Sequence, residues 1–264
     1  MQILKRSITL LLLLGVSSFL QASTAAVEIQ KGITLFKAKQ FNTSFKQLKL
    51  YADQGYPKAQ FYIGLLYDMG GIAMMDKRKA VIWYRKAADQ GLAEAEYDMG
   101  VMYSKGEGIN KDLKLALTWY LKAAKHDSKY AMYNLGVIYE RGYGTEQNLT
   151  QAIQWYQQGI EKNMPKAAYN LASLYYHGDK VPQDLKLAYT LYQQAAASGH
   201  TEAAFTLGYM LENGKGCKKS LDNAKKWYIE AAINGHQNAR KNLGLLLQKT
   251  GETGKASFWL SHTK

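Results

Sequence analysis

The side chains that could do chemistry in this sequence are few and far apart. The histidines are His126, His177, His200, His236 and His262. None of them forms an H-x-x-x-H pair or stands at metal-ligand spacing from Cys217, the only cysteine. No G-x-S-x-G sequence is present to hold a hydrolase serine at a sharp turn. The sequence therefore predicts no catalytic residue, no metal site and no cofactor.

Pairs of glycines separated by one residue could be mistaken for phosphate-binding loops. The pairs are Gly106/Gly108, Gly142/Gly144 and Gly214/Gly216. None has the G-x-x-x-x-G-K-[ST] spacing of a phosphate loop, and no strand is expected before them. Glycine also suits the left-handed backbone just past a helix end. Because the pairs recur at a fixed spacing, we interpret them as helix terminators.

The tryptophans reveal the spacing that organises the whole chain. A period of 36 residues is marked by Trp83, Trp119, Trp155, Leu191 and Trp227, and Trp259 arrives four residues early. An alanine register from Ala59 to Ala239 and a glycine register from Gly64 to Gly244 keep the same step. A fixed period of this length indicates stacked copies of one supersecondary unit. Such a solenoid typically binds other molecules along an extended surface.

Each copy is expected to be an antiparallel pair of helices, here called A and B. In residues 128–163, helix A is apolar nearly all round, which is typical of a helix buried between neighbours. Helix B follows an N-cap residue whose side chain can accept a first-turn N–H. The N-cap positions hold Asp76, Asp112, Asn148, Asp184 and Ser220. Helix B should end at a glycine, or at Asp127 and Asn163, which tolerate positive φ.

These residues also carry a family resemblance. The pattern A-x-x-x-x-G-x-x-Y-x-x-G-x-G, an N-cap residue, then A-x-x-W-Y-x-x-A-A-x-x-G resembles the Sel-like repeat family, a branch of the tetratricopeptide-repeat superfamily. The resemblance is close over residues 52–251. It implies an all-α fold, a right-handed superhelical solenoid of about six to seven antiparallel helix pairs.

The expected organisation follows from the repeat boundaries. It comprises a signal peptide at 1–22, a degenerate helical repeat at 27–55, repeats at 56–91, 92–127, 128–163, 164–199 and 200–235, and a shortened capping repeat at 236–264. The fourth of the five full copies departs from the pattern at Ala172, Lys180 and Leu191. We expect these departures to alter local packing in that copy and to leave the fold intact.

Polar residues of helix A form the candidate partner-binding surface. At 100° per residue, the sector not covered by apolar residues includes positions −2 and +5 from the helix-A glycine. These positions hold Asp98, Asn134, Asn170, Thr206, Asn242, Lys105, Arg141 and His177. The resemblance places helix A on the concave face, and asparagine can both donate to and accept from a peptide backbone. The alternative is that Asn134 and Asn170 brace adjacent repeats, and the sequence leaves both open.

The first residues have the features of an export signal. Lys5 and Arg6 precede an apolar run that is too short for a membrane span, and small residues follow up to Ala26. We expect cleavage after Ala22 or a few residues later, and no stable transmembrane segment afterwards. Together with the family resemblance, this predicts export to the periplasm of a Gram-negative bacterium, or onward to the exterior.

The charge of the chain limits the kinds of partner. The formal net charge is +13, and loss of Lys5 and Arg6 with the signal lowers it to +11. Such a charge favours weak attraction to anionic envelope surfaces. The export signal argues against nucleic acid, and the basic residues are scattered. We therefore expect a protein or peptide partner.

Two functions remain in competition at the level of the sequence. The first is a non-enzymatic adaptor that binds a protein or peptide in the helix-A groove, with a regulatory or host-contact role implied by bacterial relatives. The second is a β-lactam or peptidoglycan hydrolase or binder, implied by a cysteine-rich branch of the family. That branch carries a cysteine pair in each repeat, whereas this chain has only Cys217. The sequence favours the adaptor.

Overall fold

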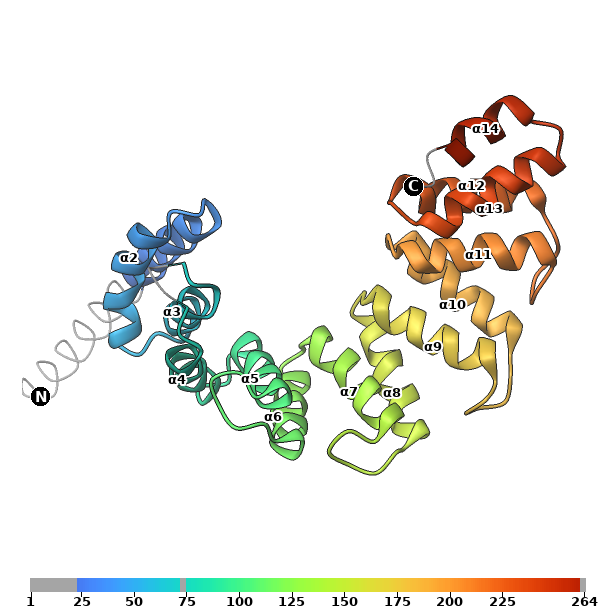
Figure 1. Cartoon of the computed structure of the whole chain (residues 1–264). Coiled ribbons are helices and arrows are strands. Elements are labelled where there is room, and N and C mark those ends of the chain that lie inside the picture. Colours follow the sequence, from blue (N-terminus) through green and yellow to red (C-terminus); the bar gives the residue numbers. More distant parts are fainter. Residues whose placement is uncertain (1–22, 72–74, 262–264) are drawn as a thin grey trace, which may run out of the picture. The chain divides into compact units, whose positions relative to one another are not determined.

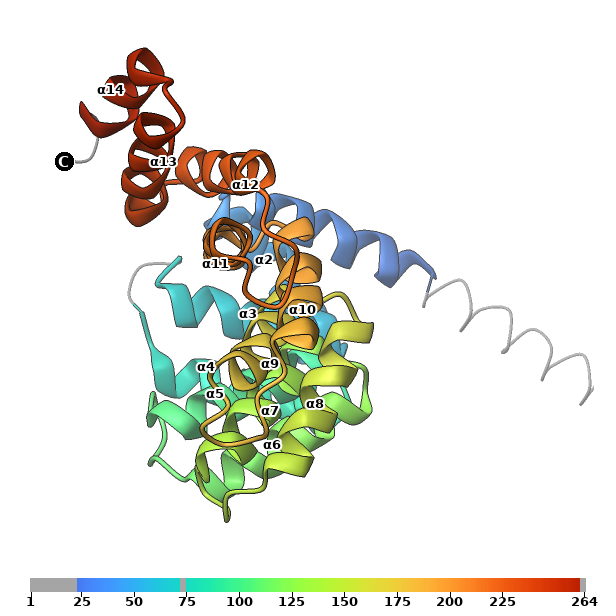
Figure 2. The same cartoon turned by 90° about the vertical axis from the view of Figure 1, so that its right-hand side faces the viewer.

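The computed structural model describes residues 23–71 and 75–261, and within them every regular element is a helix (Figures 1 and 2). A helix at 23–37 is followed by α2 (Phe41–Asp53), α3 (Pro57–Met69), α4 (Lys77–Ala88), α5 (Ala93–Lys105), α6 (Leu113–Lys125), α7 (Lys129–Arg141), α8 (Leu149–Glu161), α9 (Pro165–His177), α10 (Leu185–Ala197), α11 (Thr201–Asn213), α12 (Leu221–Ile233), α13 (Gln237–Lys249) and α14 (Thr253–Ser261). The signal peptide expected at 1–22 lies outside the described residues. None of the helices described is both long and apolar enough to cross a bilayer.

The described helices group into two compact units, one made of those that precede residue 129 and the other of those from residue 129 onward. Within the first unit α3 packs on α4 and α5 packs on α6. Within the second unit the pairs are α7 with α8, α9 with α10, α11 with α12 and α13 with α14. The fold is an all-α solenoid of helical hairpins, which confirms the predicted class.

The expected N-caps of the helix-B elements are all formed. Asp184 accepts a hydrogen bond from the Leu187 backbone N–H at 2.9 Å. Equivalent bonds run to the side chains of Asp76, Asp112, Asn148 and Ser220. Each satisfies a first-turn N–H that has no partner within its helix, and loss of one cap typically costs about 1 kcal/mol.

The helix ends also follow the sequence prediction. Gly106 and Gly214 end helix-A elements with φ of 78° and 71°. At two helix-B ends without glycine, Asp127 and Asn163 adopt positive φ, at 65° and 55°. The glycine pairs therefore terminate helices, as predicted.

The glycine register exists because a tyrosine ring lies against helix A. A Cβ added to Gly136 would stand 2.4 Å from Cδ1 of Tyr156, and the corresponding distance from Gly208 to Tyr228 is 2.5 Å. Both tyrosines are fully buried on helix B, whereas the preceding Trp155 is only partly buried. The tryptophans reveal the period in the sequence, but the tyrosine that follows four of the five is the more deeply buried side chain.

The fourth copy, where the sequence departs from the pattern, remains well packed. Ala172 replaces the glycine against Tyr192, and Leu191 takes the tryptophan position. All three side chains are buried in the core of the second unit. The third departure, Lys180, is exposed at the surface and does not enter this core.

Candidate functional site

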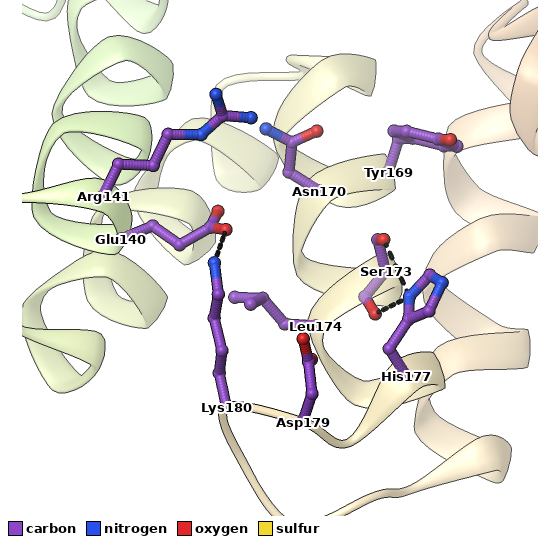
Figure 3. Close-up of a pocket in the computed structure, with 9 residues that line it drawn as sticks. All are labelled: Glu140, Arg141, Tyr169, Asn170, Ser173, Leu174, His177, Asp179 and Lys180. Carbon is purple, nitrogen blue, oxygen red and sulfur yellow. Dashed lines mark hydrogen bonds and ion pairs between the residues drawn. The ribbon is translucent and has the colours of Figure 1, made fainter.

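The second unit contains a polar cavity of about 370 Å³ beside α9 (Figure 3). It is lined by Glu140, Arg141, Tyr169, Asn170, Ser173, Leu174, His177, Asp179 and Lys180. The five residues from α9 are spaced so that they share one face of that helix. The last turn of α7 supplies two residues, and the segment after α9 supplies the remaining two.

Lys180 occupies a loop position where other copies have glycine, and its side chain forms part of the cavity wall. At the equivalent loop position, Gly216 has φ of 68°, and an added Cβ would stand 2.1 Å from the backbone oxygen of Leu185. Lys180 does not adopt the left-handed backbone. Its ammonium instead reaches back to the preceding repeat, where Nζ lies 2.7 Å from Oε1 of Glu140 (Figure 3).

Glu140 and Asn170 are joined through a buried tyrosine hydroxyl. Tyr156 donates to Oε2 of Glu140 at 2.8 Å, and Nδ2 of Asn170 donates to the Tyr156 hydroxyl at 3.2 Å. Burial and the neighbouring Glu140 carboxylate raise the pKa of Tyr156, so the hydroxyl keeps its proton. Because Tyr156 belongs to α8 and Asn170 to α9, this hydroxyl bridge couples two successive repeats.

Part of this bridge recurs further along the second unit. Tyr228 donates to Oε2 of Glu212 at 2.9 Å. Asn242 stands at the position that corresponds to Asn170, where it lowers the pKa of Tyr228 against the larger raising effect of burial. Of the two asparagines for which the sequence left a bracing role open, Asn170 takes that role here, and no inter-repeat hydrogen bond of Asn134 is found among the described residues. Asn170 also lines the cavity, so bracing and exposure to a ligand coincide at this residue.

Arg141 and His177 stand at the rim with few partners. Nη1 of Arg141 donates to the Tyr143 hydroxyl at 3.3 Å. Nδ1 of His177 lies 2.9 Å from the backbone oxygen of Ser173, so the proton of this ring belongs on Nδ1. Both side chains are exposed.

Tyr169, the aromatic residue that lines the cavity, packs against a histidine of the next repeat. The rings of Tyr169 and His200 stack with centroids 4.5 Å apart, and Nδ1 of His200 caps α11 by accepting from Ala203 N–H at 3.3 Å. Burial lowers the pKa of His200, which favours the neutral ring that capping requires. Tyr169 is thus fixed by the next repeat.

The cavity brings together three of the eight predicted residues, Arg141, Asn170 and His177. The other five do not line it. In the second unit, Thr206 donates to the Glu202 backbone oxygen at 2.9 Å, and Asn134 and Asn242 are half-buried. In the first unit, Lys105 is exposed and lies 3.7 Å from Glu107, and Asp98 is half-buried.

Sequence reasoning missed the other lining residues, above all Glu140 and Lys180. One signal was available, because Lys180 replaces the second loop glycine that three of the other four full copies carry, at Gly108, Gly144 and Gly216. No sequence rule could show that its ammonium would meet a carboxylate 40 positions earlier. That pairing depends on how the helices stack.

The first unit has different polar groups at the positions that form the hydroxyl bridge in the second unit. Asp68 and Asp98 occupy the positions of Glu140 and Asn170 around Tyr84. Within the part of the chain that the structure describes, the buried Tyr84 hydroxyl makes no hydrogen bond. Burial, with the nearby carboxylates of Asp68 and Glu94, raises the pKa of Asp98 to about 7.

Comparison with known proteins supplies the family. The Sel1 repeat profile matches five successive segments, residues 57–92, 93–128, 129–164, 165–200 and 201–236. Comparison with curated proteins gives no significant match. The chain is 34% identical to a Sel1 repeat protein from Oxalobacter formigenes, with a TM-score of 0.75, over 90% of this chain and 96% of that one.

Two further solved structures are similar. A protective antigen present in uropathogenic Escherichia coli strains is 30% identical with a TM-score of 0.78, covering 92% of this chain and 54% of that one, so this chain spans about half of its length. An immunity protein from Pseudomonas aeruginosa, at 20% identity over 80% of this chain and 81% of that one, has a TM-score of 0.52 and shares the fold alone. With five family repeats and a relative matched over nearly its whole length, the chain belongs to the Sel1 repeat family, whose members generally serve as protein-interaction scaffolds.

Proposed function

We propose that this protein is a non-enzymatic adaptor that binds an extended protein segment along its helix-A surface, with the α9 cavity as an anchor. The observation that carries the proposal is the cavity itself, because it gathers three residues of the predicted helix-A surface. A repeat scaffold presents such residues at regular intervals, so one segment can contact several copies.

The chemistry of the cavity suits a polypeptide. A peptide backbone offers both N–H and C=O groups, and the cavity offers both kinds of partner. Oδ1 of Asn170 has no partner among the described residues and can accept an N–H, while the guanidinium of Arg141 can donate. Tyr169 supplies an aromatic wall, and such rings are favoured at protein interfaces.

We further propose that the adaptor works in the cell envelope or outside the cell. The basic n-region, the short apolar run and the small residues up to Ala26 support export. N-terminal sequencing of protein from periplasmic and culture fractions tests this. A mature chain beginning near Ser23 is expected, and protein in the cytosolic fraction that retains Met1 would contradict it.

Site-specific photo-crosslinking in living cells tests the binding surface. Benzoylphenylalanine in place of His177 at the cavity rim should give covalent adducts with a partner. The matched control places the same group at Lys226, an exposed helix-B residue outside the cavity. Lys225 is unsuitable because its ammonium pairs with Glu252 at 2.8 Å.

The two positions make the outcome decisive. Adducts from position 177 and none from 226 support the helix-A surface. Adducts from position 226 alone would place the binding face on helix B. Mass spectrometry of the adducts then identifies the partner.

A further inference from the structure

We infer that the α9 cavity recognises an acidic side chain of the bound segment through the guanidinium of Arg141. The inference rests on the proposed function and specifies the chemistry of its partner. It starts from an imbalance in how the charged groups of the cavity are paired.

The two cations of the cavity differ in their partners. Lys180 is paired with Glu140 at 2.7 Å, and Glu140 also accepts from Tyr156, so its carboxylate is fully engaged. Arg141 hydrogen-bonds the Tyr143 hydroxyl and lies over the ring of the same tyrosine, and no carboxylate forms an ion pair with it within the described residues. An exposed guanidinium with five N–H donors and one neutral partner can accept a carboxylate without first breaking an ion pair.

The surroundings of Arg141 add a second donor. Figure 3 shows the guanidinium extending toward Asn170, whose amide nitrogen lies on the side facing it. That nitrogen uses one hydrogen for the Tyr156 hydroxyl and has a second. A carboxylate bound here would receive N–H groups from both residues, and charge-assisted hydrogen bonds of this kind are stronger than neutral ones.

The negative groups of the cavity lie elsewhere. Figure 3 shows Asp179 on the Lys180 side of the cavity, apart from the Arg141 guanidinium. The Glu140 carboxylate points to Lys180, which neutralises it. An incoming acidic group therefore meets its strongest repulsion at Asp179 and its strongest attraction at Arg141.

An acidic side chain fits better than a chain terminus. About 370 Å³ is near the lower limit of ligand pockets, enough for one side chain and its adjoining backbone. Helix-A surface positions continue beyond the cavity on α11 and α13 of the same unit, with Thr206 and Asn242. A segment passing through the cavity can reach them, whereas a segment that ends there cannot.

An array of nine-residue peptides tests the inference. The peptides are acetylated and amidated, so that they carry no terminal carboxylate, and each fixes one residue type at the central position among random neighbours. The proteins are the wild type, Arg141→Gln and the control Lys249→Gln, which removes a positive charge from the same helix-A position in the last copy. Melting temperatures of both variants should match the wild type, because both side chains are exposed.

The wild type should prefer Asp or Glu at the central position. Fluorescence anisotropy with the best acidic peptide should show about a tenfold weaker Kd for Arg141→Gln, which corresponds to about 1.4 kcal/mol. Lys249→Gln should change Kd by less than about twofold. Replacing the central Asp by Asn in the peptide should weaken wild-type binding equally and add nothing in Arg141→Gln, as expected for a coupled pair.

Each other outcome has a distinct meaning. Equal losses in Arg141→Gln and Lys249→Gln would show only the general attraction of a basic protein, and would overturn the inference. Peptides that bind the cavity without acidic preference, or only with a free terminal carboxylate, would overturn it while the proposed adaptor stands. No binding by any peptide would count against the adaptor function itself.

Discussion

The two units place polar side chains at the same positions around a buried tyrosine hydroxyl, but the chemistry of those side chains differs. In the second unit, the Tyr156 hydroxyl donates to Glu140 and accepts from Asn170. In the first unit, two carboxylates, Asp68 and Asp98, stand at the corresponding positions around Tyr84, whose buried hydroxyl makes no hydrogen bond among the described residues.

Side-chain length and donor count explain this difference. Aspartate is one methylene shorter than glutamate, and Asp68 is drawn to Lys77, whose Nζ lies 2.6 Å away. An ionised Asp98 cannot donate to the Tyr84 hydroxyl as the Asn170 amide donates to Tyr156. Two repeats can therefore have the same backbone fold although the buried tyrosine hydroxyl between repeats is hydrogen-bonded in one and not in the other.

The largest expected effect concerns a contact that both units have, between a helix-A glycine and a buried helix-B tyrosine. Gly136→Leu and Gly64→Leu should each destabilise the protein by about 3 kcal/mol or more, because a Cβ would stand 2.4 Å or 2.6 Å from a buried tyrosine ring. Urea denaturation followed by circular dichroism measures both. A small loss at Gly64 alone would mean that the ring contacts of the two units are not equivalent.

The next effect concerns Asp98. Its folded-state pKa of about 7 lies above the usual aspartate value of about 3.9, so the folded protein holds a proton that the unfolded chain releases between these values. Stability should therefore fall as pH rises from about 4 to about 7, and Asp98→Asn should remove this fall. The gain at pH 8 should be on the order of 2 kcal/mol, allowing for partial exposure.

The reverse substitution sharpens the same comparison. Asn170→Asp should give the second unit the pH dependence that Asp98→Asn removes from the first. Melting temperatures at pH 5 and pH 8 measure both variants. The same loss at both pH values for Asn170→Asp would contradict the electrostatic explanation.

Removal of the tyrosine hydroxyl should change the free energy of unfolding by different amounts in the two units, and this difference is smaller than the effects above. Tyr156→Phe leaves Nδ2 of Asn170 without its partner and should cost about 1.5 kcal/mol. Tyr84→Phe loses no hydrogen bond and should be neutral or slightly stabilising. Denaturation midpoints of the two variants measure the difference, and equal losses would show that the Tyr84 hydroxyl is satisfied in solution.

The smallest effect concerns the lysines that pair with the acidic residues. Lys180→Gln should cost less than about 1 kcal/mol, because this pair is partly exposed and Glu140 keeps the Tyr156 hydroxyl. Lys77→Gln should cost slightly more, because its ammonium also contacts Glu107 at 3.0 Å. Thermal melts at low salt detect both. A larger loss at Lys180 would mean that the Glu140 carboxylate depends on it.

Much of the fold could be predicted because each local sequence signal recurs in several copies of the repeat. Asp184 and its four counterparts are recognisable as N-caps, since capping is a local bond over two or three residues. Asp127 and Asn163 were predictable at helix ends for the same reason. The candidate site was predicted only in part, because helix periodicity gives the face of Arg141, Asn170 and His177 but not their neighbours from other copies.

The sequence by itself determined the all-α class, the 36-residue period, the helix limits and the positions of the helix-A surface, because these depend on propensities and spacings within one copy. Only the tertiary structure decided which polar groups meet between copies. The pairing of Lys180 with Glu140 and the bridge from Glu140 through Tyr156 to Asn170 depend on stacking to within an ångström. Hydrogen bonds weaken steeply with distance and angle, so a periodicity in sequence cannot specify them.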